Sequence, residues 1–155
     1  MKFVSFLLKG QPKFGVSDGK NITDLTGKIK GAQTLKELII NNSINEAKEF
    51  SKKNPGKINV DEIDYLPVIP NPGKIVCVGL NYSEHVKETG RTVEQNPVIF
   101  LRVPESQTAH KQPIQRPKVS ESLDYECEMA VIMGDAGKHV PVSYTHLRAH
   151  ETYPH

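Results

Sequence analysis

The 155-residue sequence has no tryptophan, only two cysteines, few aromatic residues (6%) and no long apolar run. Two cysteines cannot build a disulfide-rich scaffold, so we expect a reducing, cytoplasmic location. The apolar run at residues 3–8 ends at Lys9, which makes it too short for a signal peptide or for a membrane span of about 18 residues. These absences predict a globular, cytoplasmic protein without a membrane partner.

An excess of charge of one sign is also missing. The sequence has 20 lysine and arginine residues and 18 acidic residues, which gives a formal net charge of +2. The one lysine-dense stretch, residues 48–57, is interrupted by Glu49 and by polar residues, as is typical of a solvated helix face. Because binding of nucleic acid through its phosphates needs a concentrated basic surface, we expect no nucleic-acid partner.

Residues 1–66 are predicted to form a small N-terminal β/α domain. Apolar runs and turn residues, among them the hairpin signal Asp18-Gly19, predict strands at residues 3–8, 14–16 and 21–25. Two capping-box patterns, Thr34 with Glu37 and Ser43 with Glu46, predict the starts of two helices.

A proline-rich stretch over residues 65–73 predicts a boundary, because proline makes the chain extended and stiff. The second part, residues 67–141, is predicted to be rich in strands, with one short helix at 83–89 closed by Gly90. Its strands are expected at residues 74–79, 97–101 and 123–133, the first of them buried on both faces. The sequence as a whole therefore predicts an α+β, β-rich fold class.

Glu126 and Glu128 are the first candidate site. On a strand, positions i and i+2 share a face, so the two carboxylates would project together at the entrance to an apolar run. Such a pair needs a compensating cation when it loses water, and hard oxygen ligands suit Mg²⁺, Mn²⁺ or Ca²⁺. The alternative is a strand with one face in water, which is the commoner use of this pattern.

His85 and Glu88 are the second candidate site. Three positions apart on a helix, they share a face and are able to hydrogen-bond. A carboxylate that accepts from one ring nitrogen leaves the other nitrogen basic, as a general base requires. An exposed histidine beside a glutamate on a short surface helix is the alternative, and the pattern taken alone favours this alternative.

Three segments together resemble the fumarylacetoacetate hydrolase family. They read NPGKIVCVGLNYSEHVKETG, NPVIFLRVPES and SLDYECEMAVIMG, in the family's order and spacing, from about residue 70 to 141. The N-terminal part is similar to the smaller leading domain of the long prokaryotic members. The resemblance implies a catalytic domain built as a mixed β-sheet or roll, of which residues 67–141 would be an incomplete first part.

The resemblance also implies roles for individual residues. Glu126 and Glu128 match the first two carboxylate ligands of a divalent metal, usually Mg²⁺ or Mn²⁺. His85 and Glu88 match the pair that activates water in acylpyruvate hydrolase-like members, and Arg102 stands where the family carries a basic residue near the substrate. Next to it, Glu105 replaces the small hydroxyl residue expected in that loop, and the third carboxylate ligand cannot be placed in this chain.

These roles imply metal-dependent hydrolysis of a C–C bond in a small β-diketo or oxo acid by a protein that forms a homodimer at full length. An oxaloacetate-type decarboxylase and a 2-hydroxyhepta-2,4-diene-1,7-dioate-type isomerase are the alternatives within the superfamily. A non-catalytic metal- or small-molecule-binding module is the alternative from another class. Without a third ligand, the 155-residue chain itself is expected to bind metal weakly, to lack turnover and to aggregate.

The last segment, residues 142–155, is expected not to be native. Its string VSYTHLRAHET resembles one reading frame of a transposase-type sequencing adapter. His146, His150 and Glu151 imitate the spacing of helical zinc ligands, and we assign them no function. Native sequence continuing through codon 142 in the gene would overturn this expectation.

Overall fold

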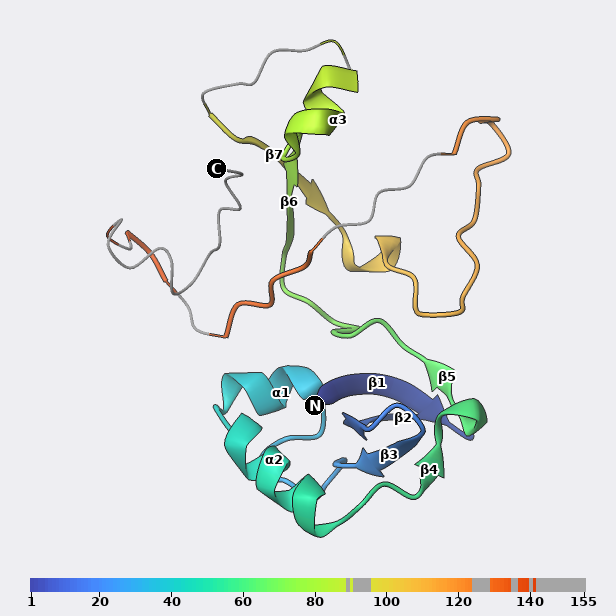
Figure 1. Ribbon diagram of the computed structural model, residues 1–155, viewed down its shortest axis with the longest axis vertical. Coiled ribbons are helices and arrows are strands. Elements are labelled where there is room, and N and C mark those ends of the chain that lie inside the picture. Colours follow the sequence, from blue (N-terminus) through green and yellow to red (C-terminus); the bar gives the residue numbers. More distant parts are fainter. Residues whose placement is uncertain (89, 91–95, 124–128, 135–136, 140, 142–155) are drawn as a thin grey trace.

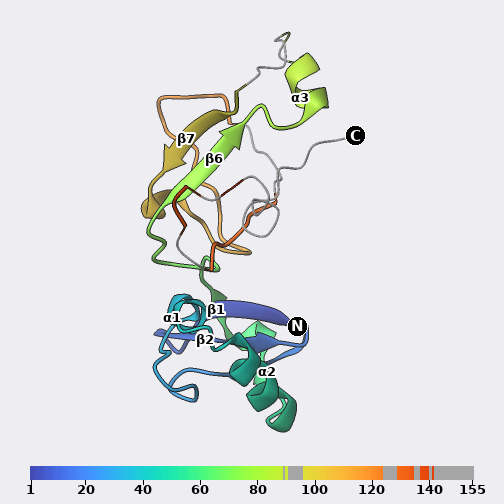
Figure 2. The ribbon, with the colours of Figure 1, turned by 90° about the vertical axis from the view of Figure 1, so that its left-hand side faces the viewer.

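The computed structural model describes residues 1–88, 90, 96–123, 129–134, 137–139 and 141, with the side chains of Ser83 and His85 outside the description. The chain first forms a compact unit of five short strands and two helices, and then a two-stranded ribbon that carries a third helix (Figure 1). Figure 2 shows the ribbon standing apart from this N-terminal unit, with the proline-rich linker between them. The α+β, β-rich fold class is confirmed.

The N-terminal sheet is antiparallel throughout, with the strand order β4-β3-β2-β1-β5. Lys9 and Gly10 join its first two strands with φ angles of 52° and 76°, the two left-handed residues that a tight hairpin turn requires. At the next turn, the Asp18 carboxylate accepts from the backbone N–H groups of Lys20 and Asn21 at 2.8 and 2.7 Å, so this predicted hairpin is confirmed. The strands are β1 (Lys2–Leu8), β2 (Gln11–Ser17), β3 (Asn21–Asp24), β4 (Ile58–Asn59) and β5 (Asp64–Tyr65).

Both predicted helices are present, as α1 (Leu35–Ile40) and α2 (Ile44–Lys53). The Thr34–Glu37 capping box is confirmed, because each of the two side chains accepts from the other residue's backbone N–H. The second capping box is wrong: Ser43 lacks the extended backbone of a cap, and its hydroxyl donates to Asn41 O instead, at 3.3 Å. A short 3₁₀ turn, η1 (Val60–Glu62), links β4 to β5.

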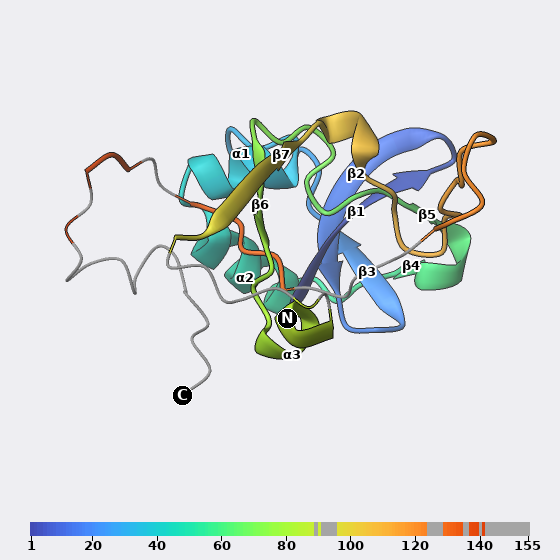
Figure 3. The same ribbon diagram turned by 90° about the horizontal axis from the view of Figure 1, so that it is seen from above.

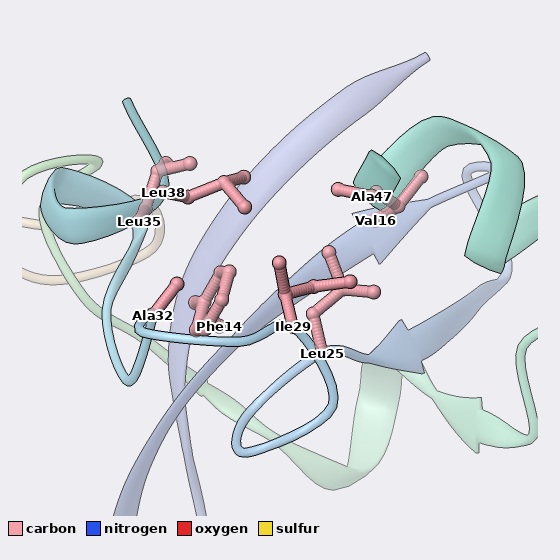
Figure 4. Close-up of a cluster of buried hydrophobic side chains, with 8 residues drawn as sticks. All are labelled: Phe14, Val16, Leu25, Ile29, Ala32, Leu35, Leu38 and Ala47. Atoms are coloured by element: carbon pink, nitrogen blue, oxygen red, sulfur yellow. The ribbon is translucent and has the colours of Figure 1, made fainter. Parts of the chain in front are cut away.

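The helices and the loop before them cover one face of the sheet (Figure 3). Phe14 and Val16 of β2 pack there against residues of that loop, of α1 and of α2 (Figure 4). Because alternate residues of a strand point to opposite faces, Phe6 and Ile22 are buried outside this cluster. The cluster consists of Phe14, Val16, Leu25, Ile29, Ala32, Leu35, Leu38 and Ala47.

Ser5 of β1 ties the linker to this sheet. Its side chain is buried in β1, and its hydroxyl donates to Val68 O at 2.8 Å. Ser5→Ala removes the donor, and we expect it to lower the free energy of unfolding by about 1 kcal/mol. Urea titration checks this, with Ser51→Ala as the control, since the Ser51 hydroxyl donates within its own helix, to Lys48 O at 2.9 Å. Equal effects of the two substitutions would contradict the expectation.

Asp24 makes the stability of the sheet depend on pH. Partial burial by itself would raise the pKa of Asp24, but hydrogen bonds from Lys13 Nζ (2.6 Å) and Thr26 N–H (2.9 Å) outweigh it and hold the pKa below its ordinary value. A lowered pKa stabilises the fold above the unfolded-state value of about 4, and this stabilisation is lost as the pH falls through the folded value.

We therefore expect Asp24→Asn to reduce the loss of stability that accompanies acidification from pH 5 to pH 2. Urea titrations over this range are the measurement. Glu49→Gln is the control, because the Glu49–Lys52 pair is exposed on α2 and contributes little. An unchanged pH slope in Asp24→Asn would contradict the assignment.

The second part of the chain forms an antiparallel ribbon from β6 (Ile75–Gly79) and β7 (Val98–Arg102), with α3 (Ser83–Glu88) between them in sequence. One face of the ribbon, here called the apolar ribbon face, consists of Val76 and Val78 of β6 and Ile99 and Leu101 of β7. Val76 is 55% exposed and Leu101 71% exposed, so the expectation that this first strand is buried on both faces is wrong. Nothing in the described part of the chain packs closely enough on this face to bury it.

The strand predicted over residues 123–133 is also not found where the structure describes it. Leu123 and residues 129–133 have no strand pairing and are exposed, and residues 124–128 lie outside the described residues. A strand forms only when its backbone N–H and C=O groups find a partner, and the described residues provide none for this segment. The helices that the structure describes are also too short or too polar to cross a membrane.

Candidate functional site

Helix α3 carries the predicted His85–Glu88 pair. Its six residues contain both members three positions apart, and Gly90, with a φ of 67°, donates its N–H to Lys87 O at 3.0 Å just past the helix end. The predicted closure of this helix by glycine is therefore confirmed. The orientation of the histidine ring lies outside the described residues, so the hydrogen bond between the pair stays a prediction.

An ion pair on the same helix was not predicted. Lys87 Nζ lies 2.8 Å from a Glu84 carboxylate oxygen, and both side chains are more than two-thirds exposed. Their i,i+3 spacing is the one that predicted the His85–Glu88 contact, and could have identified this pair as well. Such an exposed pair contributes little to stability and marks the solvated side of α3.

Arg102, the predicted substrate-binding residue, ends β7 and is exposed. The next turn, η2 (Pro104–Ser106), holds its guanidinium: Nε donates to Ser106 Oγ at 3.1 Å, and Nη2 donates to Ser106 O at 3.4 Å. Sequence reasoning missed Ser106, although a serine four residues beyond a strand-end arginine was available as a signal. Nη1 makes no hydrogen bond to the described residues, which leaves donors for a carboxylate.

The predicted metal ligands cannot be placed from the structure, because Glu126 and Glu128 lie outside the described residues. Within the residues that are described, no three histidine, cysteine, aspartate or glutamate side chains come together as a metal site would require. The argument for a divalent cation at Glu126 and Glu128 thus rests on the chemistry of these two side chains, because such ions prefer hard oxygen donors.

An open cleft lies between the N-terminal unit and the loop that follows η2. Tyr65 of β5 meets His110 of this loop edge to face, with ring centroids 5.0 Å apart. None of the predicted site residues lines the cleft, so it does not join the candidate groups into one site. Its lining consists of Leu7, Asp64, Tyr65, Leu66, Pro67, Gln107, Thr108, Ala109, Gln112, Pro113 and Gln115.

Comparisons with known proteins agree with the resemblance in the sequence. The mitochondrial oxaloacetate tautomerase Fahd2a of Rattus norvegicus is 38% identical over 79 residues, which are 51% of this chain and 25% of that protein. The mitochondrial oxaloacetate tautomerase fahd2 of Xenopus laevis is 31% identical over 134 residues, which are 83% of this chain and 42% of that protein. The chain thus spans less than half the length of these relatives.

Solved structures and the family model complete the comparison. The crystal structure of a protein described as HpcE from Mycobacterium smegmatis has the same fold over 76% of this chain and 41% of its own, with a TM-score of 0.57 and 20% identity. Residues 74–149 match the family model for the fumarylacetoacetate (FAA) hydrolase C-terminal domain, and this match includes the first residues of the segment expected to be adapter-derived. The second part of this chain, residues 74–149, is thus similar to the C-terminal domain of the fumarylacetoacetate hydrolase family.

Proposed function

We propose that this chain contributes the first part of an enzyme that interconverts or cleaves small oxo acids, with keto–enol tautomerisation of oxaloacetate as the reaction to test first. The observation that carries the proposal is the similarity of this chain to proteins named oxaloacetate tautomerases in rat and frog. The expected C–C hydrolysis is the second candidate, and the His85–Glu88 spacing on α3 favours it, because a paired base suits the activation of water.

Both reactions require the protein to bind the carboxylate of the substrate. The substrate carries a carboxylate next to a ketone, and a guanidinium with open donors is the group that binds a carboxylate with defined orientation. In this proposal Arg102 binds that carboxylate. The open Nη1 of its exposed side chain, beside the two donors that Ser106 fixes, supports the role.

The two reactions differ in what the base does. Tautomerisation needs a group that removes a proton from the carbon next to the ketone and a donor that returns a proton to the enolate oxygen. Hydrolysis needs a base that takes a proton from water. His85, with Glu88 one helical turn away, is proposed for either task. A divalent ion held by Glu126, Glu128 and a further ligand would supply positive charge beside the enolate oxygen.

The test is an assay on the longest product of the gene that encodes this chain. Enol absorbance reports oxaloacetate tautomerisation, and acylpyruvate consumption reports hydrolysis, each with and without Mg²⁺ or Mn²⁺. We expect His85→Ala and Glu126→Gln each to lower kcat/KM by roughly 100-fold or more. Glu84→Gln, on the solvated side of α3, is the control and should leave the rate unchanged. Wild-type rates in both His85→Ala and Glu126→Gln would contradict the proposed roles.

A further inference from the structure

The linker between the two parts of the chain is fastened to the N-terminal unit. Leu66 N–H donates to Ser5 O at 2.9 Å, the Ser5 hydroxyl donates to Val68 O, and Lys36 Nζ donates to Asn71 O at 2.8 Å. Between these contacts, Ile69 packs against the buried cluster of Figure 4. The proline-rich stretch is therefore an extension of the N-terminal unit as far as residue 71, with its backbone carbonyls at fixed positions.

One of these carbonyls holds the turn that follows β7. Gln107 is half-buried, and its Nε2 donates to Ile69 O at 3.3 Å and to Pro104 O at 3.2 Å. The side-chain amide thus uses both of its hydrogens, one on the linker and one on the turn itself. Of the described side chains in η2 and in the residue after it, Gln107 alone bonds to the N-terminal unit or its linker.

The same turn fixes the guanidinium of Arg102. The backbone N–H and the hydroxyl of Ser106 both donate to Val103 O, at 3.0 and 2.7 Å, so the position of Ser106 follows from that of the turn. Ser106 then accepts from Nε and Nη2 of Arg102. The backbone of the turn therefore links two sets of hydrogen bonds, those from Gln107 to Ile69 O and Pro104 O and those from Arg102 to Ser106.

We propose that Gln107 is a positioning residue through which the N-terminal unit orients Arg102 for a carboxylate ligand. The inference rests on the proposed function, in which Arg102 binds the substrate carboxylate. An arginine side chain at an exposed strand end samples many rotamers, and holding the turn restricts the guanidinium to the orientation that Ser106 imposes. The N-terminal unit would in this way contribute to substrate binding without contacting the substrate.

The experiment compares the full chain with two variants. Gln107→Leu keeps most of the side-chain volume without the two donors, and Gln107→Ala also removes the packing. Gln115→Ala, in the same loop, is the control, because the exposed Gln115 side chain makes no hydrogen bond to the residues that the structure describes. We expect the backbone amides of Ser106 and Gln107 to exchange with deuterium about three- to tenfold faster in both Gln107 variants and at the wild-type rate in the control.

A second readout separates positioning from a general loosening of the turn. Oxalate, a small dicarboxylate, is titrated by calorimetry into the wild type, Gln107→Leu, Arg102→Ala and the double variant. We expect Gln107→Leu to weaken oxalate binding about three- to tenfold when Arg102 is present, and to have no further effect when it is absent. If Gln107 only stabilised the turn, its substitution would change oxalate binding equally with and without Arg102.

The outcomes separate the two proposals. Unchanged exchange in both Gln107 variants, or an effect on oxalate binding of equal size with and without Arg102, would overturn the positioning role. If exchange responds but the wild type does not bind oxalate, the proposed role of Arg102 in binding substrate fails, while the coupling of the turn to the N-terminal unit stands.

Discussion

Gly15→Ala is expected to lower the free energy of unfolding of the N-terminal unit by about 3 kcal/mol or more, a large share of its stability. A Cβ atom at Gly15 would lie 2.2 Å from the carbonyl oxygen of Thr23 and 2.9 Å from Cγ2 of Ile22. The first of these contacts is with the backbone of β3, which cannot rotate away as a side chain would. The β2–β3 pairing, which places Gly15 opposite Asp24, therefore has to separate to make room.

The size of this effect follows from how little stability a small unit has. Overpacking typically destabilises by about 1–3 kcal/mol, and a rigid backbone contact is at or above the upper end of this range. A unit of about 70 residues has roughly 4–10 kcal/mol in total. Thermal and urea unfolding followed by circular dichroism are the measurements. Gly73→Ala is the control, because a Cβ there has nothing within 4 Å and its φ is not left-handed; a wild-type melting temperature for Gly15→Ala would contradict the prediction.

Placing two lysines on the apolar ribbon face is expected to convert an associating chain into a largely monomeric one. Ile99 and Leu101 are 58% and 71% exposed and lie opposite Val78 and Val76, so all four side chains form one contiguous surface. Exposed apolar surface next to unpaired strand edges favours association, and lysine on a strand is a device by which natural sheets prevent it.

The variant Ile99→Lys with Leu101→Lys should lower the apparent association constant about tenfold or more, corresponding to at least about 1.4 kcal/mol. Sedimentation velocity over a range of concentrations measures this, and the binding of a fluorescent apolar dye should decrease in parallel. Val119→Lys is the matched control: Val119 is 97% exposed but lies outside the ribbon. Association that persists unchanged in the double variant would show that another surface is responsible.

Local patterns predicted the N-terminal unit well. The hairpin at Asp18-Gly19 and the capping box at Thr34 depend only on residues within three or four positions, and the structure contains both. Ser43 shows the limit of the same reasoning. Its sequence pattern matches that of Thr34, but α2 follows α1 so closely that the backbone at Ser43 stays near the helical region, where its hydroxyl is not able to cap.

Contacts between distant residues were beyond the sequence. The strand β5 is two residues long and pairs with β1 almost 60 positions away, and no local pattern marks it. The exposure of Val76 depends on what packs against the ribbon, which an apolar run by itself does not specify. At the candidate site, Arg102 was found through the family resemblance, but Ser106 and Gln107 emerge only from the geometry of the turn around it.

The position of β1 between β2 and the edge strand β5 has a consequence for the order in which the sheet forms during synthesis. β1 is synthesised first and is able to pair with β2 as soon as the hairpin emerges from the ribosome. Its other neighbour, β5, consists of residues 64 and 65 and is synthesised much later. At a synthesis rate of about 5–20 residues per second, that edge of β1 stays unpaired for several seconds. The linker residues that bond to the N-terminal unit follow β5 directly in the sequence. The N-terminal unit is therefore complete only when β6, the first strand of the second part, begins to emerge.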